Sequence, residues 1–240
     1  MTAASPEAVA RHPHLAAVVP TGHVRVDLHT HTMWSGDSTT TPEEFERAVA
    51  ASGLDVVCVT DHNAIAGAVE LRDRIAARVI VGEELRTAQG EIIGLFLSER
   101  VPMGIGHLDA ARAIRDQGGV VYVPHPFDPM RRNLSERALH ELAEADLIDA
   151  VEVLNAKTSL PSLNRRAAEF AAGFGIVAGA GSDAHVPDAL GAAFVQMPEF
   201  ETPIEFLAAL AAGSVVGHHW DEPRPWTPRI VPSVTSADPA

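Results

Sequence analysis

The stretch 27-DLHTHTMWSGDS-38 follows directly on the short apolar run 24-VRV-26 and places His29 and His31 where a strand should end. Side chains two residues apart on a strand point to the same side, so both imidazoles can bind one ion. A carboxylate close to a histidine ligand commonly orients it, which suggests a supporting role for Asp27. The stretch therefore predicts that a metal site begins at the carboxyl end of a first strand.

Along the rest of the chain, runs rich in Val, Ile and Leu alternate six or seven times with segments of helical spacing. Several runs are continuously apolar, as expected of strands covered on both faces. The alternation predicts an α/β fold with a parallel sheet, and a closed barrel fits better than a dinucleotide-binding sheet because no G-x-G-x-x-G turn follows the first strand. The predicted strands are 24–28, 56–60, 79–82, 92–97, 120–124, 150–154 and 176–181, and the predicted helices are 41–53, 64–76, 107–118, 135–145, 161–175 and 203–213.

The 240 residues suit one domain. We expect a loose N-terminal leader over residues 1–22, a barrel over 23–220, and an extended tail over 221–240, where five prolines occur. Apolar runs are far shorter than the roughly 20 residues of a membrane span, and the N-terminus lacks the pattern of a secretory signal. These features predict a cytoplasmic protein, in which the lone Cys58 forms no intramolecular disulfide.

The formal net charge is −14, from 32 acidic against 18 basic residues, and this balance disfavours binding to extended nucleic acid. Clustered carboxylates can instead hold divalent cations, which offset part of the charge. The sequence supports this alternative because acidic residues and histidines gather where the predicted strands end.

Parallel barrel strands open their carboxyl ends on one face, so residues far apart in the sequence converge there. Nine candidate ligands suit two or three ions, and imidazole mixed with carboxylate favours Zn, Mn or Fe. Asp61, beside His62, either supports a ligand or caps a turn. Glu152 and Asn155 end another strand. The nine candidates are His29, His31, Asp37, His62, Glu84, Glu91, His125, Asp183 and His185.

Four motifs in order resemble the polymerase and histidinol phosphatase family, the PHP domain. They are 27-DLHTHTMWSGDS-38, 60-TDHN-63, 124-PHP-126 and 182-SDAH-185. The resemblance implies a distorted (β/α)7 TIM-like barrel whose metal centre, at the carboxyl ends of the strands, hydrolyses phosphoesters. It also implies three ion positions: His29, His31, Glu84 and Asp183 for one; Glu84, His125 and Glu91 for a second; Asp37, His62 and His185 for a third.

Three family positions are ambiguous or differ in this chain. The bridging glutamate of the family lies in a G-x-E segment, which favours Glu84 over Glu83 in 82-GEEL-85. Many members carry histidine at the position of Glu91, and some carry histidine at that of Asp37. The occupancy of the third ion position therefore stays open.

The acidic composition and compact length favour a small phosphorylated metabolite or nucleotide as substrate. With the metal centre that the resemblance implies, we expect a hydroxide that bridges two ions to cleave it. Glu84, Asp183 and His185 are the expected catalytic residues. We expect Arg131, Arg132, Asn155 and Lys157, which follow the fifth and sixth strands, to hold the substrate phosphate.

Two other functions compete with this one. An amidohydrolase-like enzyme also ends its first strand with H-x-H, but it would be expected to supply a lysine at a strand end, and Lys157 lies beyond one. A noncatalytic PHP module of the kind attached to polymerases is less consistent with the sequence, because every motif ligand is present and the 240 residues contain no polymerase module.

Overall fold

The computed structural model describes residues 3–220, so the expected tail over 221–240 lies outside the described residues. One curved sheet dominates this part of the chain, in the order β7-β6-β5-β4-β3-β2-β1-β8-β9. All seven predicted strands are present, and β8 and β9 were not predicted. The strands are β1 His23–Thr30, β2 Val56–Val59, β3 Arg78–Thr87, β4 Gly90–Leu95, β5 Val120–Val123, β6 Ala150–Asn155, β7 Val177–Gly181, β8 Ala193–Pro198 and β9 Ser214–Gly217.

Strands β1 to β3 are parallel, as are β5 to β7, but β4 is antiparallel to both of its neighbours. The expectation of a wholly parallel sheet is therefore wrong for β4, and also for β8 and β9, which extend the sheet antiparallel from β1. For β3 and β4 the physical reason is the connection, since parallel neighbours require a long crossover. Only two residues separate β3 from β4, so the sheet departs from seven regular strand–helix units.

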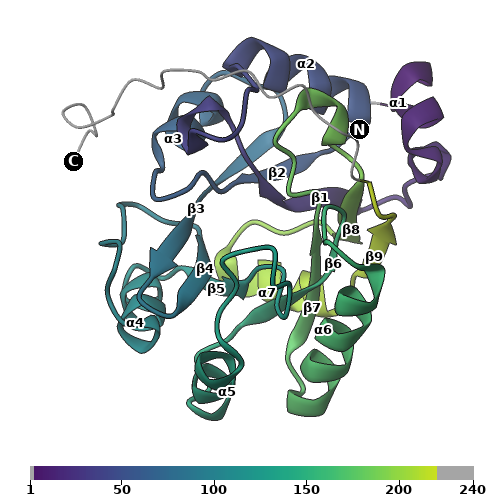
Figure 1. Cartoon of the computed structure of the whole chain (residues 1–240). Helices are drawn as coiled ribbons and strands as arrows, with labels where there is room; N and C mark the ends of the chain where they lie inside the picture. Colours follow the sequence, from purple (N-terminus) through teal and green to yellow (C-terminus); the bar gives the residue numbers. More distant parts are fainter. Residues whose placement is uncertain (1–2, 221–240) are drawn as a thin grey trace.

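The sheet closes on itself where β7 returns to β1. A parallel bridge joins Thr30 to Ala184, and the amide of Asp183 donates to the carbonyl of His29 at 2.8 Å. A Cβ atom on Gly181 would overlap His29, so glycine allows this close approach. The α/β barrel-like architecture is confirmed, and residues of the first and fourth motifs themselves make the closure (Figure 1).

Helices α2 to α6 lie around the outside of the curved sheet, whereas α7 packs against the residues of its interior (Figure 1). Helix α2 begins at a capping box, in which Thr41 and Glu44 satisfy each other's backbone amides. The helices are α1 Pro6–Arg11, α2 Pro42–Ser52, α3 Ala66–Arg72, α4 His107–Asp116, α5 Glu136–Glu144, α6 Pro161–Phe174 and α7 Pro203–Ala211. The six predicted helices correspond to α2 to α7.

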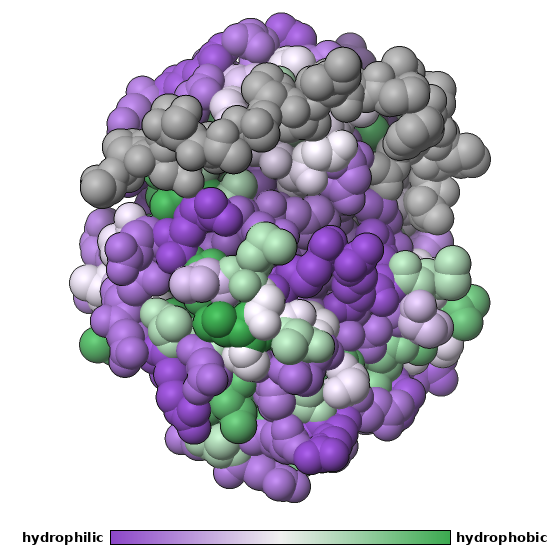
Figure 2. All heavy atoms as spheres, turned by 60° about the vertical axis from the view of Figure 1, so that its left-hand side comes forward, coloured by the Kyte–Doolittle hydropathy of each residue, from purple (hydrophilic) through white to green (hydrophobic). Residues whose placement is uncertain are grey.

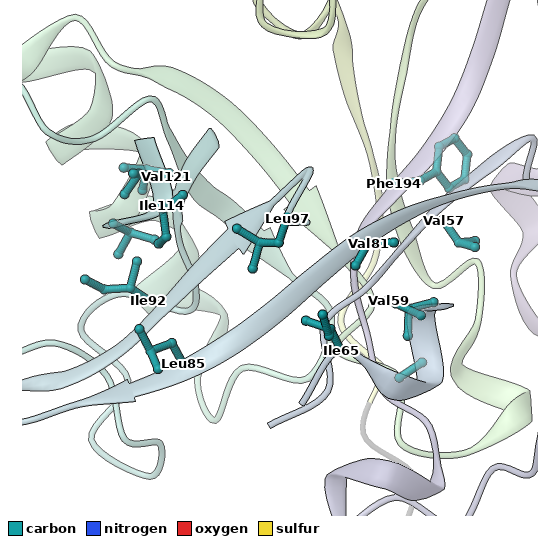
Figure 3. Close-up of a cluster of buried hydrophobic side chains, with 14 of the residues drawn as sticks. Val57, Val59, Ile65, Val81, Leu85, Ile92, Leu97, Ile114, Val121 and Phe194 are labelled. Carbon is teal, nitrogen blue, oxygen red and sulfur yellow. The ribbon is translucent and has the colours of Figure 1, made fainter. Parts of the chain in front are cut away.

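Alternate strand residues form two apolar clusters, as a period of two requires. Val57 and Val59 of β2 pack outward with Leu85, Ile92 and other residues beneath the helices, as Figure 3 shows. The alternate residues, such as Cys58, fill the barrel interior, to which α7 adds Phe206 and Leu210. Each fully buried side chain of this kind contributes roughly 1.5–3 kcal/mol, so the clusters hold the strand ends in place.

The N-terminal segment is not loose over residues 5–16. Ala8 and Leu15 are buried in the outer cluster, and the amide of Ser5 donates to the carbonyl of Ala51 at the end of α2, at 2.7 Å. Arg25 is also buried and donates to the carbonyl of Leu15 at 3.1 Å. Ala8 of α1 and Leu15 just beyond it supply the buried apolar contacts of this segment.

Within residues 3–220, none of the helices has the length and apolar character needed to cross a bilayer. In the view of Figure 2, hydrophilic residues cover most of the described surface, and apolar residues lie in small groups among them. Single exposed apolar residues of this kind are usual in globular proteins.

Candidate metal centre

The end of β1 brings the Nε2 atoms of two buried imidazoles close together. The Nε2 atoms of His29 and His31 lie 2.9 Å apart, and both side chains are fully buried. Each ring is oriented through its other nitrogen, His29 by the Glu152 carboxylate at 3.1 Å and His31 by the Ser35 hydroxyl at 2.8 Å. The two Nε2 atoms can therefore share one proton or one cation.

Glu84 of β3 faces the same point and reaches four histidines. Its carboxylate oxygens lie 2.9 Å from His125 Nε2, 3.0 Å from His62 Nδ1, 3.3 Å from His31 Nε2 and 3.4 Å from His29 Nε2. Glu83 instead accepts the amide of Val101 at 3.0 Å. Strand alternation thus turns Glu84, and not its neighbour, toward the histidines.

Glu91 comes to this mouth although it begins β4. Because β3 and β4 are antiparallel, the first residues of β4 pair with the last residues of β3, and Glu91 lies opposite Arg86. Its carboxylate is 3.9 Å from His62 Nδ1 and 3.8 Å from Arg86 Nε. The hairpin thereby brings a residue from the amino end of a strand to the same mouth as the carboxyl ends of the parallel strands.

All nine predicted ligands gather at this mouth. Within residues 3–220, four groups of three side chains place donor atoms within 4.8 Å of one another, and they include every predicted ligand except Asp37. Asp37 is half exposed and lies 3.4 Å from His62 Nε2 and 3.3 Å from His185 Nε2. The groups are His29, His31 and Glu84; Glu84, Glu91 and His125; His31, His62 and His185; and His29, His125 and Asp183.

The donor set fits divalent metal ions. His62 Nδ1 is buried and has no hydrogen-bond partner, although a Glu84 oxygen lies only 3.0 Å away. Two groups this close without hydrogen-bond geometry are arranged as two ligands of one cation would be. Mixed imidazole and carboxylate donors suit Zn, Mn or Fe better than Ca.

Neighbouring charges outweigh the effect of burial on the pKa values of His62 and Glu84, but not on that of Glu91. Burial alone would lower the pKa of His62, but the carboxylates of Glu84 and Asp37 outweigh it and raise this pKa to about 9. Burial would raise the pKa of Glu84, but His62 and His29 hold it well below its usual range. Burial and the neighbouring Glu84 raise the pKa of Glu91 to about 7. The surroundings thus favour the charged forms of His62 and Glu84 and the neutral form of Glu91.

The two supporting aspartates stabilise backbone turns. Asp27 accepts the amides of His29 at 3.2 Å and Ser182 at 2.9 Å, and burial raises its pKa to about 7. Asp61 accepts the amide of Thr32 at 2.6 Å and the hydroxyl of Ser35 at 2.8 Å. Because Ser35 also contacts the ring of His31, Asp61 both holds the backbone at Thr32 and supports the ring of His31.

Two protein-family models match this chain. Residues 27–155 match the model of the PHP domain, and residues 161–215 match the PHP-associated model. The chain belongs to the PHP family. An uncharacterized protein of Methanocaldococcus jannaschii, MJ1587, is 38% identical over 146 residues, which cover 55% of this chain and 82% of that protein.

Two solved structures share the PHP fold of this chain. A two-domain protein of Bacteroides vulgatus that contains a predicted PHP-like metal-dependent phosphoesterase has a TM-score of 0.67 and 19% identity, over 84% of this chain and 68% of that one. An amidohydrolase of Chromobacterium violaceum has a TM-score of 0.58 and 17% identity, over 80% of this chain and 97% of that one. At these identities the likeness shows the fold alone.

A polar cavity of about 430 Å³ opens at the mouth of the PHP barrel. Arg131 and Arg132 line it, as does Arg86, which the sequence reasoning missed. Arg131 pairs with Asp183 at 2.8 Å, and Lys157 Nζ lies 2.9 Å from His185 Nδ1. Three arginines thus share the lining of the cavity with four carboxylates.

Asn155 and Glu152 lie beneath the cavity, fully buried. Asn155 donates to Glu152 at 2.9 Å and to Asp183 at 3.3 Å, so it holds side chains of the centre. Glu152, for which the sequence analysis predicted no role, accepts hydrogen bonds from Asn155, from His29 and, at 2.7 Å, from the amide of His125. An acidic residue inside the buried strand AVEVL was the available signal.

Proposed function

We propose that this PHP chain is a metal-dependent phosphoesterase that hydrolyses a small phosphorylated metabolite or nucleotide. The observation that carries the proposal is the juxtaposition of grouped imidazole and carboxylate donors with an arginine-lined cavity. The donors suit a Lewis acid, and the guanidinium groups suit a phosphate, which arginine can bind through two hydrogen bonds.

The donor groups support two or three divalent ions, Zn, Mn or Fe. One would be held by His29, His31, Glu84 and Asp183, a second by Glu84, Glu91 and His125, and a third by Asp37, His62 and His185. When bound, such ions make water nucleophilic near neutral pH and polarise phosphoryl oxygens. Glu84, which faces four histidines, is the proposed bridge.

The remaining polar residues act on the substrate. Arg131 and Arg132 hold the nonbridging oxygens, and Lys157, which pairs with His185, adds a third positive charge. His185 stabilises the leaving alkoxide. Asn155 keeps Asp183 in place and does not itself reach the cavity.

Turnover by metal-reconstituted protein tests this proposal. Phosphomonoesters, phosphodiesters and nucleoside phosphates form the substrate panel, and His29→Ala is the control that removes a ligand. We expect hydrolysis of at least one class by the wild-type chain and none by the variant. Metal-containing wild-type protein that cleaves no phosphoester would contradict the proposal.

The likeness to an amidohydrolase structure favours a second candidate, hydrolysis of another bond at the same centre. Such an enzyme would be expected to use a lysine at a strand end, whereas Lys157 lies beyond β6 and pairs with His185. Amide and lactone substrates added to the panel distinguish the two candidates. A noncatalytic module would cleave no member of the panel.

A further inference from the structure

Two neighbouring loops carry cations at the cavity: Arg131 lines it, and Lys157 contacts His185, which lines it. The loop after β5 carries Arg131, and the loop after β6 carries Lys157. Asp128 lies between them and is fully buried, yet it is not among the predicted ligands and does not line the cavity. A buried carboxylate needs hydrogen-bond donors for both oxygens.

Asp128 obtains those donors from both loops. One oxygen accepts the amide of Met130 at 3.0 Å and the hydroxyl of Ser159 at 2.6 Å. The other accepts the amide of Ser159 at 2.7 Å and the hydroxyl of Thr158 at 3.2 Å. Burial opposes ionisation, but the hydrogen bonds from Ser159 outweigh it and lower the pKa of Asp128. The carboxylate is therefore a charged link between the loops.

The same link reaches the two cations. The amide of Arg131 donates to the carbonyl of Asp128 at 3.0 Å. The guanidinium of Arg131 crosses to the carbonyl of Lys157 at 3.2 Å. Thr158 and Ser159, which the carboxylate holds, directly follow Lys157. Both cations thus lie on loop backbone that one buried side chain holds together, in addition to their contacts with Asp183 and His185.

We propose that Asp128 is a positioning residue that fixes Arg131 and Lys157 in the geometry that binds the phosphate group. This inference rests on the proposed function and deepens it. Loops are less rigid than strands, so cations on loops need a supporting contact to be preorganised. A carboxylate shared by the two loops supplies that contact without touching the substrate.

Binding of inorganic phosphate to the metal-loaded protein tests the inference without turnover. Asp128→Asn keeps the size of the side chain but loses its charge and part of its accepting capacity. We expect the dissociation constant for phosphate to rise roughly tenfold to a hundredfold, because small misplacements of positioning groups have effects of this size. Metal content stays unchanged, and KM for a cleaved ester rises more than kcat falls.

Asp149→Asn is the matched control. Asp149 accepts the amide of Val121 at 2.7 Å and pairs with Arg115 at 2.8 Å, near the amino ends of the same two strands. Its variant loses an equivalent carboxylate and should bind phosphate as the wild-type chain does. If both variants weaken phosphate binding equally, Asp128 has only a structural role.

A double-mutant cycle with Arg131→Ala gives the decisive result. If Asp128 acts through the cations, Asp128→Asn adds far less in the Arg131→Ala background than in the wild type. Full additivity, or wild-type phosphate affinity in Asp128→Asn, would overturn the inference. If Asp128→Asn does not fold, Ser159→Ala, which deletes one donor, should show the same effect at about threefold, and unchanged affinity there would also overturn it.

The outcome is separable from that of the proposed function. A wild-type chain that binds phosphate but cleaves no ester would contradict the proposed function, and the variants would still decide the role of Asp128. A metal-loaded wild-type chain that binds no phosphate would overturn the assignment of Arg131 and this inference together.

Discussion

Replacement of Glu84 by glutamine tests the centre most specifically. The carboxylate lies within 3.4 Å of four histidines. One of them, His62, has a pKa of about 9 and is therefore mostly protonated at neutral pH. Glu84→Gln leaves that buried imidazolium without its principal partner, and loss of one member of a buried ion pair costs roughly 3–5 kcal/mol.

For a domain of this size, a change of 1 kcal/mol shifts Tm by roughly 2–4 °C, so we expect metal-free Glu84→Gln to melt roughly 6–20 °C below the wild-type chain. Elemental analysis of metal-replete protein should show at least one ion fewer per chain, because Glu84 belongs to two donor groups. Thermal unfolding and metal content are measured on the same preparations.

Glu83→Gln is the matched control, since Glu83 is the adjacent residue, equally buried, and faces the other side of β3. We expect it to lose stability and to keep its full metal content. The reasoning is refuted if Glu84→Gln retains every ion, or if Glu83→Gln loses one.

Three further predictions follow from the same contacts. The raised pKa of His62 contributes stability that is fully present below its usual pKa of 6.5 and is lost as the pH rises through about 9; denaturant unfolding of metal-free protein should show this loss, and His62→Gln should abolish it. Glu152→Gln should weaken metal affinity roughly 10–100-fold without changing the saturating stoichiometry, because it frees the ring of His29, and unchanged affinity in a metal-competition titration would count against that role. Gly181→Ala should lower the unfolding free energy because its Cβ overlaps His29. Gly173→Ala, in an open position of α6, should instead raise the unfolding free energy by about 0.4–1 kcal/mol. Equal effects of the two variants would contradict the packing argument.

Much of the fold and the donor set could be predicted from the sequence because both depend on local patterns. Strand alternation alone places His29 and His31 on one side, and the carboxyl ends of parallel strands bring His62 and His185 to the same mouth. The direction of β4 could not be read in this way, since an apolar run has no direction. The short β3–β4 connection was the available signal.

Supporting residues were harder to predict because their partners are set by tertiary packing. Glu152 was placed at the end of a strand, but nothing in AVEVL says that its carboxylate meets His29, 123 residues earlier in the chain. Asp128 was not singled out, because the donors that satisfy it come from a loop 31 residues later. Arg86 was missed for the same reason, as the hairpin alone brings it to the cavity.

Anomalous diffraction from crystals of the metal-loaded chain tests directly whether the barrel mouth holds a multinuclear metal centre. Data collected at the absorption edge of the bound metal locate each ion independently of any assumed ligand. We expect two or three anomalous peaks per chain at the barrel mouth, with Glu84 between two of them. A single peak, or ions bound only away from the nine side chains, would contradict the multinuclear centre.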